Sequence, residues 1–172
     1  MAVKKIYLYI ILLIFFTNKS FACQLLNVPI GTNVSSAVST FEFIDAYSAD
    51  LYGDEFSAKY EDYAQDYCEG SSLENSDLEV IVYKSKIAGI NLVNSHNNSK
   101  NEIYEFVKSF ISDPGSETKS NNWTGYKNLS IGDLLIFYGK TKIANETIEY
   151  LEITNPEMID FTIGERVMNA TG

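Results

Sequence analysis

The chain contains 172 residues, of which 45% are hydrophobic and 21% charged, and its formal net charge is -10. This is the composition of a globular protein, and its acidic balance disfavours binding to the phosphate backbone of nucleic acids. One histidine and two cysteines are too few for His-rich or Cys-rich metal centres. We therefore expect neither a metal nor another cofactor.

The N-terminus has the order of a secretory signal peptide. The basic pair Lys4-Lys5 precedes an unbroken apolar run, 6–16, which is too short for the roughly 20 residues that span a bilayer. The small residue Ala22 predicts cleavage directly after it and export to the periplasm or the extracellular space. Residues 23–172 would then form one domain. Because Cys23 would become the first residue, a lipid anchor on this cysteine is the alternative to free release.

The two cysteines, Cys23 and Cys68, predict a disulfide, because an exported protein folds in an oxidising compartment. The alternative is a catalytic thiol at Cys68 with His96 as its base. The acidic neighbours Asp66 and Glu69 disfavour a reactive thiolate. The sequence therefore favours the disulfide.

The first helix is predicted to begin after Thr32 or Asn33, because either side chain can cap it. Apolar residues then recur at steps of three and four. They are Val34, Ala37, Val38, Phe41 and Ile44.

A second helix is predicted over residues 50–68, where aromatic residues recur at the same steps. They are Tyr52, Phe56, Tyr60, Tyr63 and Tyr67. One interpretation is a stripe that faces the core, with the acidic residues on the solvated side. The other is a partly exposed surface for a protein partner, because tyrosine offers a large ring and a polar tip. That surface would comprise Tyr52, Tyr60, Tyr63, Tyr67 and Trp123.

Two hairpins are predicted from β-rich runs. The first pairs residues 78–83 with 87–93 across a turn at 84–86. The second pairs 134–143 with 147–154 across a turn at 144–146. The residues before the second hairpin, 115–128, are polar and predict a loop.

A third helix is predicted over 103–111 from its apolar periodicity. Ser99 and Glu102 have the spacing of a capping box at its start, and Asp113-Pro114-Gly115 would stop it. A short last helix is expected from Asn155-Pro156. The fold class is therefore α+β, with helices packed on one face of an antiparallel sheet built from two hairpins.

No catalytic constellation stands out, so we expect an exported, non-catalytic acidic domain that binds another protein, with a basic partner favoured by charge. One alternative is a small secreted hydrolase that uses carboxylates as acid and base. Its candidate acids are Asp45, Asp50, Asp54 and Glu55. Another alternative is an inhibitor that offers acidic side chains to a basic enzyme.

Overall fold

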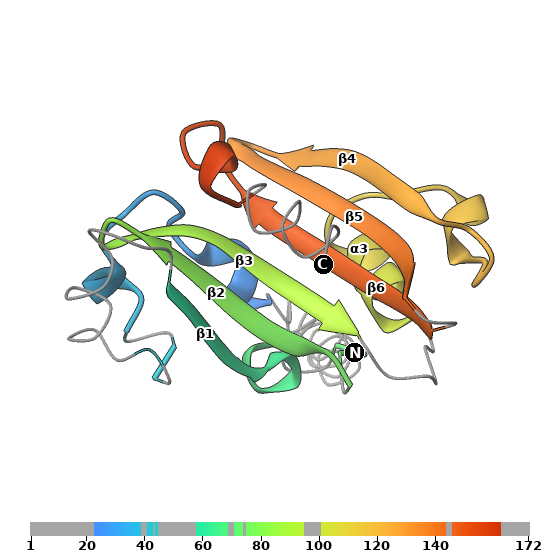
Figure 1. Ribbon diagram of the computed structural model, residues 1–172, viewed down its shortest axis with the longest axis horizontal. Coiled ribbons are helices and arrows are strands. Elements are labelled where there is room, and N and C mark those ends of the chain that lie inside the picture. The colour runs from blue at the N-terminus through green and yellow to red at the C-terminus, as the bar shows by residue number, and fades with distance from the viewer. Residues whose placement is uncertain are drawn as a thin grey trace, which may run out of the picture.

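The computed structural model describes residues 23–38, 41–42, 44, 58–68, 71–73, 75–94, 101–143 and 146–162, and an antiparallel sheet forms most of this part of the chain (Figure 1). The strands are β1 (Ala58–Tyr63), β2 (Asp77–Tyr83), β3 (Lys86–Asn94), β4 (Gly125–Ile131), β5 (Leu134–Ile143) and β6 (Glu146–Thr154). The longest helix of these residues is α3 (Glu102–Phe110). Short 3-10 helices are η1 (Gln24–Asn27), η2 (Val34–Ser36), η3 (Ala64–Tyr67) and η4 (Ser116–Lys119). The expected signal peptide and its cleavage point lie outside the described residues.

The strand order is β1-β2-β3-β6-β5-β4, and every neighbouring pair is antiparallel. Two three-stranded meanders therefore meet where β3 pairs with β6, with Leu92 opposite Leu151. Both predicted hairpins are confirmed, as β2–β3 and β5–β6. The sheet is larger than the two hairpins predicted, because β1 and β4 extend it at its two edges.

The tight turn between β2 and β3 consists of Lys84 and Ser85, whose φ angles are 49° and 56°. Positive φ at both central residues is the geometry of the hairpin turns whose twist matches that of paired strands. The predicted turn is thus confirmed, although neither residue is the glycine that usually occupies such positions.

The helix predicted over 50–68 is wrong over residues 58–63, which form strand β1, and only residues 64–67 of its described part form a short 3-10 helix. The backbone of β1 pairs with β2, with Tyr60 opposite Val80 and Tyr63 opposite Asp77. In a strand, side chains three positions apart point to opposite faces, so the aromatic stripe does not form. Tyrosine also suits a pleated, half-buried surface, which made the spacing ambiguous. Tyr52 and Phe56 lie outside the described residues.

The polar segment predicted as a loop, 115–128, includes η4 and runs into the edge strand β4, which begins at Gly125. Lys127, Leu129 and Ile131 alternate with exposed residues, and each of the three is half-buried. This period of two is the sequence signal of a strand with one solvated face. The glycine after Ile131 has a φ of 56° and turns the chain into β5.

Helix α3 confirms the helix predicted over 103–111, and it packs on β3 and β6. Ile103, Phe106 and Val107 are buried in one core with the apolar residues of the sheet. The predicted capping box between Ser99 and Glu102 is not seen at the start of α3. Ser99 lies outside the described residues. The Glu102 carboxylate accepts hydrogen bonds from the backbone and side-chain amides of Asn75 at 3.1 and 2.9 Å.

The N-terminal helix is only partly supported. Asn33 caps η2, since its Oδ1 accepts from the Ser35 N–H at 2.9 Å, and Val34 and Phe41 are buried as predicted. The described residues nevertheless form a short 3-10 helix and turns. Residues 39, 40 and 43 of the predicted helix lie outside the described ranges.

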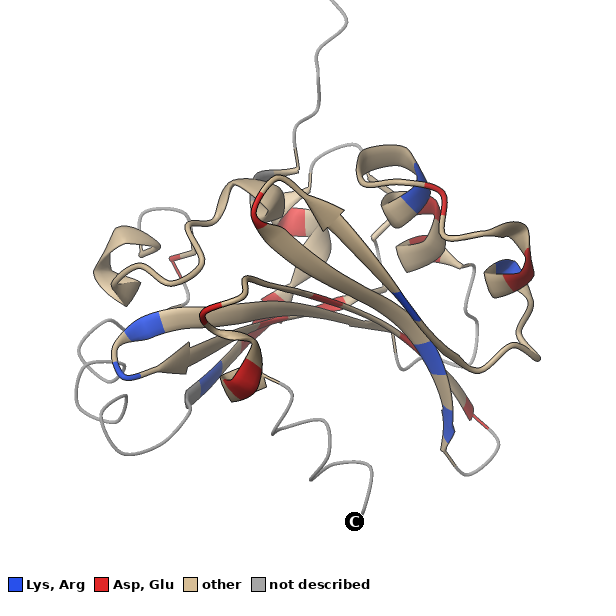
Figure 2. Ribbon diagram, turned by 90° about the horizontal axis from the view of Figure 1, so that it is seen from above, with Lys and Arg blue, Asp and Glu red and all other residues tan. Residues whose placement is uncertain are grey.

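A helical turn at 159–162 packs on the face of the sheet opposite α3, so the helices are not confined to one face (Figure 2). Thr162 donates to Glu152 at 2.9 Å, and a Cβ at Gly89 would lie 2.7 Å from the Thr162 methyl carbon. The short helix predicted from Asn155-Pro156 thus forms as turns followed by this helical turn, and Asn155 Oδ1 accepts from the Glu157 and Met158 amides at its start.

Candidate functional site

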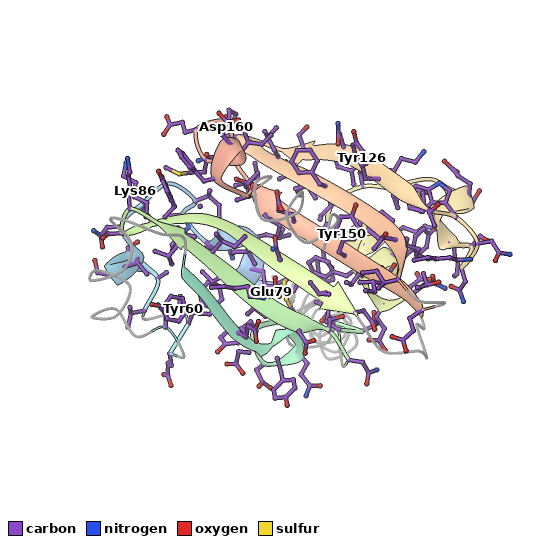
Figure 3. All side chains as sticks on the ribbon, in the orientation of Figure 1. Tyr60, Glu79, Lys86, Tyr126, Tyr150 and Asp160 are labelled. Atoms are coloured by element: carbon purple, nitrogen blue, oxygen red, sulfur yellow. A yellow bond between two sulfur atoms is a disulfide. The ribbon has the colours of Figure 1, made fainter. Side chains whose placement is uncertain are left out.

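The two faces of the sheet differ in composition because side chains alternate along each strand. On β2, Leu78 and Val80 are buried on the face that α3 covers, while Asp77 and Glu79 point to the other side. We call this second side the open face. Among the described residues, the turn at 159–162 packs against it. Figure 3 is seen from the open face, with Glu79 and Tyr150 towards the viewer.

A hollow of about 340 Å³ lies where β1 ends and β2 begins. We call it the acidic hollow, and its lining residues are Glu61, Asp62, Tyr63, Asp77 and Glu79. The carboxylates of Glu61, Asp77 and Glu79 face the open side at one edge of the sheet, next to a tyrosine that is 61% exposed. Asp62 lies opposite Leu78, so its side chain points to the other face. Such a charge arrangement attracts cationic groups.

Lys59 binds two carboxylates of the acidic hollow. Glu61 and Glu79 lie directly opposite each other on β1 and β2, an arrangement that would be unfavourable for two like charges alone. The Lys59 ammonium lies 2.8 Å from Glu61 and 2.9 Å from Glu79. The hydrogen bond to Glu61 raises the pKa of Lys59, and the bond to Glu79 adds to this effect. Lys59 thus offsets the repulsion between the two glutamates that face each other across β1 and β2.

One cross-strand row of the open face carries three tyrosines. Following the register from β1 to β4, this row consists of Tyr63, Asp77, Val93, Tyr150, Gly139 and Tyr126. We call it the tyrosine row. Tyr63 and Tyr126 stand at its two ends and are 61% and 63% exposed, so large aromatic side chains meet solvent at both edges of the sheet. The row connects the acidic hollow to the far edge strand.

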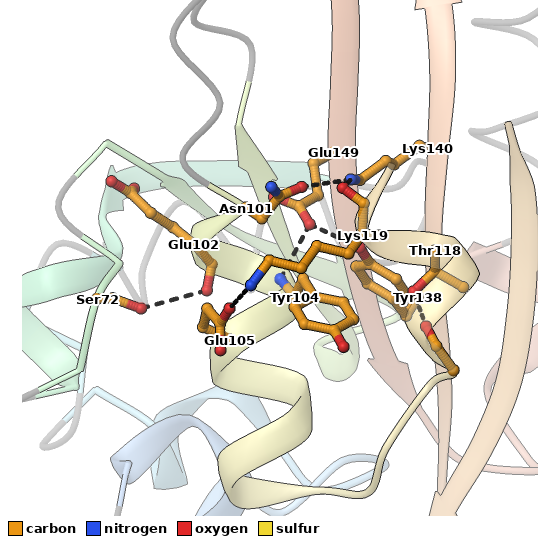
Figure 4. Close-up of polar contacts among 11 residues, drawn as sticks. Ser72, Asn101, Glu102, Tyr104, Glu105, Thr118, Lys119, Tyr138, Lys140 and Glu149 are labelled. Atoms are coloured by element: carbon orange, nitrogen blue, oxygen red, sulfur yellow. Dashed lines mark hydrogen bonds and ion pairs between the residues drawn. The ribbon is translucent and has the colours of Figure 1, made fainter. Parts of the chain in front are cut away.

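A second cluster of ionisable groups lies under α3 on the covered face (Figure 4). The Glu149 side chain is 0% exposed, and its Oε1 accepts from the Tyr104 N–H at 2.9 Å and from the Tyr138 hydroxyl at 2.7 Å. Lys140 lies opposite Glu149 on β5 and donates to Asn101 Oδ1 at 2.6 Å.

Burial shifts the protonation equilibria of this cluster. Desolvation raises the pKa of Glu149 and of Tyr138 and lowers that of Lys140. Shifted groups of this kind also occur at active sites. Here, however, Glu149 supplies a cap for α3, whose N-cap residue Asn101 makes no side-chain capping bond. With Glu149 and Tyr138 both fully buried, the cluster fits a structural anchor rather than a site that a substrate can reach.

The described members of the predicted tyrosine surface do not lie together on one surface. Tyr60 is half-buried against the core, whereas Tyr63 is exposed on the open face. The Tyr67 hydroxyl donates to Asp62 at 2.8 Å, and its ring meets Phe41 edge-on.

Trp123 stacks on the buried Tyr138 ring near the opposite edge of the sheet, away from β1. Tyr52, the remaining member of the predicted surface, lies outside the described residues. Tyr63 is therefore the member of that surface that the structure places in the acidic hollow.

The acids of the hollow were not predicted from the sequence, but a signal was present. Asp77 and Glu79 alternate with Leu78 and Val80, which is the pattern of a strand with one polar face. The candidate hydrolase acids at 45–55 and His96 lie outside the described residues. Within the described ranges, no group of three or more His, Cys, Asp or Glu side chains is placed to hold a metal ion.

The structure joins Cys23 to Cys68 by a disulfide, with both cysteines buried in the core. This agrees with the predicted pair and leaves neither sulfur available as a nucleophile. In the part of the chain that the structure describes, no helix is long and apolar enough to cross a membrane.

Comparison with known proteins gives no match to a family model, to a curated protein or to a solved structure. The function is accordingly inferred from this chain's own residues.

Proposed function

We propose that the chain is an exported, non-catalytic domain that binds a basic segment of another protein at the acidic hollow. The observation that carries the proposal is the charge of the hollow. Three acids of its lining, Glu61, Asp77 and Glu79, face the open side, and Lys59 is the one ammonium group of the described residues that bonds to them. Charge complementarity of this kind accelerates association and selects a partner of opposite charge.

The Cys23–Cys68 disulfide supports export to the periplasm or the extracellular space, because structural disulfides persist in oxidising compartments. A lipid anchor at Cys23 would use the same sulfur atom. The disulfide therefore favours free release after cleavage at Ala22 over a lipid-anchored form.

Binding is favoured over carboxylate-dependent hydrolysis by the bonding of Glu61 and Glu79. Each of them accepts from Lys59, whereas a general acid has to donate a proton to its substrate. An acidic inhibitor of a basic enzyme would use the same hollow and is a special case of the proposed binding function.

The test uses an array of random dodecapeptides probed with the mature protein. We expect the retained peptides to be enriched in Lys and Arg. The double variant Asp77→Asn/Glu79→Gln is expected to lose this enrichment and to bind the selected peptides at least about tenfold more weakly, which corresponds to about 1.4 kcal/mol.

The matched control removes the same charge elsewhere. Asp133→Asn/Glu157→Gln changes two exposed acids outside the hollow and should retain the wild-type selection. Equal loss in both double variants would show that net charge, rather than the hollow, attracts the peptides. No enrichment with the wild-type protein would contradict the proposal directly.

A further inference from the structure

We propose that the binding surface extends from the acidic hollow along the whole tyrosine row, and that it takes an extended, arginine-bearing protein segment laid across the strands. This inference rests on the proposed function, because the acidic hollow supplies one end of the surface. It adds the direction of the bound segment, its length and the side chain that it uses.

The first argument is the position of the exposed aromatic rings. Tyr63 and Tyr126 occupy the same row although they lie on β1 and β4, the two edge strands. Exposed tyrosines are common anchors of protein interfaces, because the ring buries a large area while the hydroxyl stays hydrated. A ligand that contacts both must cross every strand of the sheet.

The second argument is the shape of the row between β6 and β4. Gly139 lies between Tyr150 and Tyr126, and a Cβ at this position would lie 2.5 Å from the Tyr150 hydroxyl oxygen. The Tyr150 ring thus occupies the space above β5 that a side chain at 139 would fill. Because Gly139 has no side chain, no other side chain of the row stands between Tyr150 and Tyr126, which suits an extended segment.

The third argument concerns the chemistry of the ligand. The row combines aromatic rings with the carboxylate of Asp77, and Glu79 lies on the adjacent row. A guanidinium group stacks on aromatic faces and also binds carboxylates in a bidentate manner, whereas an ammonium group is a compact, strongly hydrated charge. The combination therefore fits arginine better than lysine.

The expected length follows from the strand spacing. Neighbouring strands lie about 4.8 Å apart, so the row from β1 to β4 spans about 24 Å. An extended peptide of about eight residues covers this distance, while one of about four residues reaches only from the hollow to the centre of the sheet.

The test uses three synthetic probes: an eight-residue Arg-Ser repeat, its four-residue half, and the eight-residue Lys-Ser repeat. Dissociation constants are measured by fluorescence anisotropy at low ionic strength. For the long arginine probe, Tyr126→Ala is expected to weaken binding about three- to fivefold. The same variant should leave the short probe unchanged. The lysine repeat should bind more weakly than the arginine repeat.

Two control variants isolate the Tyr126 ring. Tyr126→Phe keeps the ring and should bind like wild type, and Ile143→Ala removes another exposed apolar side chain, on β5, without touching the row. If Tyr126→Ala binds the long probe as wild type does, the extended surface is wrong and the hollow alone remains. Equal affinity for the arginine and lysine repeats would overturn the arginine preference.

The Asp77→Asn/Glu79→Gln variant separates the two proposals. It should weaken the short and the long probe alike, because both reach the hollow. If neither probe is affected, the proposed function itself fails, and this inference fails with it. A loss confined to Tyr126→Ala would likewise overturn both proposals, because binding would then use the tyrosine row without the hollow.

Discussion

The covered and open faces of the sheet place the same residue types in different surroundings. On the covered face, Glu149 and Tyr138 are fully buried and bonded to each other, and Glu149 also caps α3. On the open face, Glu79 forms an ion pair with Lys59 at the sheet edge, and Tyr126 is 63% exposed. Burial, rather than residue type, decides whether a carboxylate or a tyrosine anchors the fold or is available to a partner.

The largest effect on stability is expected from the disulfide, which belongs to the covered side of the molecule. Replacing Cys23 and Cys68 by serine removes a cross-link between positions 45 residues apart. The entropy regained by the unfolded chain corresponds to a loss of about 4 kcal/mol. Denaturant unfolding of wild type and double variant without reductant measures it, and a difference below about 1 kcal/mol would contradict the expectation.

A smaller but still large effect is expected at Glu149. Glu149→Ala leaves the Tyr104 N–H and the Tyr138 hydroxyl without their acceptor in the core, which should cost about 3 kcal/mol of unfolding free energy. Glu149→Gln keeps an acceptor oxygen and should cost less than half as much. Equal losses in the two variants would show that the hydrogen bonds are not what Glu149 contributes.

The pH dependence of stability sharpens the same comparison. Desolvation raises the pKa of Glu149 above 4.5, although Tyr138 and Lys140 act in the opposite direction. The folded protein therefore binds this proton more tightly than the unfolded chain does. The contribution of this proton to the unfolding free energy is fully present below pH 4.5 and is lost as the pH rises through the folded-state pKa of Glu149.

We accordingly expect the unfolding free energy of wild type to fall, relative to Glu149→Gln, as the pH rises from 4.5 towards neutrality. Parallel urea titrations of the two proteins at several pH values test this. A constant difference would mean that Glu149 has the same proton affinity in the folded and unfolded states.

The smallest effect on stability is expected on the open face. Strand β1 offers a matched pair, with Tyr60 packed against the core and Tyr63 on the open face. Tyr60→Ala removes a half-buried ring from the core and should cost about 1–2 kcal/mol, while Tyr63→Ala should change the unfolding free energy by less than about 0.5 kcal/mol. Equal costs would support the helical stripe instead of the strand, because a helix places both tyrosines on one face. Urea unfolding of the two single variants measures both differences in unfolding free energy.

Local sequence signals determined much of the fold. The alternating and apolar runs of 78–93 and 134–154 predicted two hairpins, and the periodicity of 103–111 predicted α3. The presence of only two cysteines in a chain expected to be exported predicted the disulfide between them. These features could be predicted because hairpins and short helices depend on neighbours in sequence.

The tertiary structure alone decided the edge strand β1 and the candidate site. Tyr60 and Tyr63 have a spacing that suits a helix, and only pairing with β2 makes residues 58–63 a strand with its tyrosines on opposite faces. The acidic hollow joins two consecutive strands across their register, and the tyrosine row joins strands far apart in the chain. Their assembly depends on strand order and register, which no local pattern specifies.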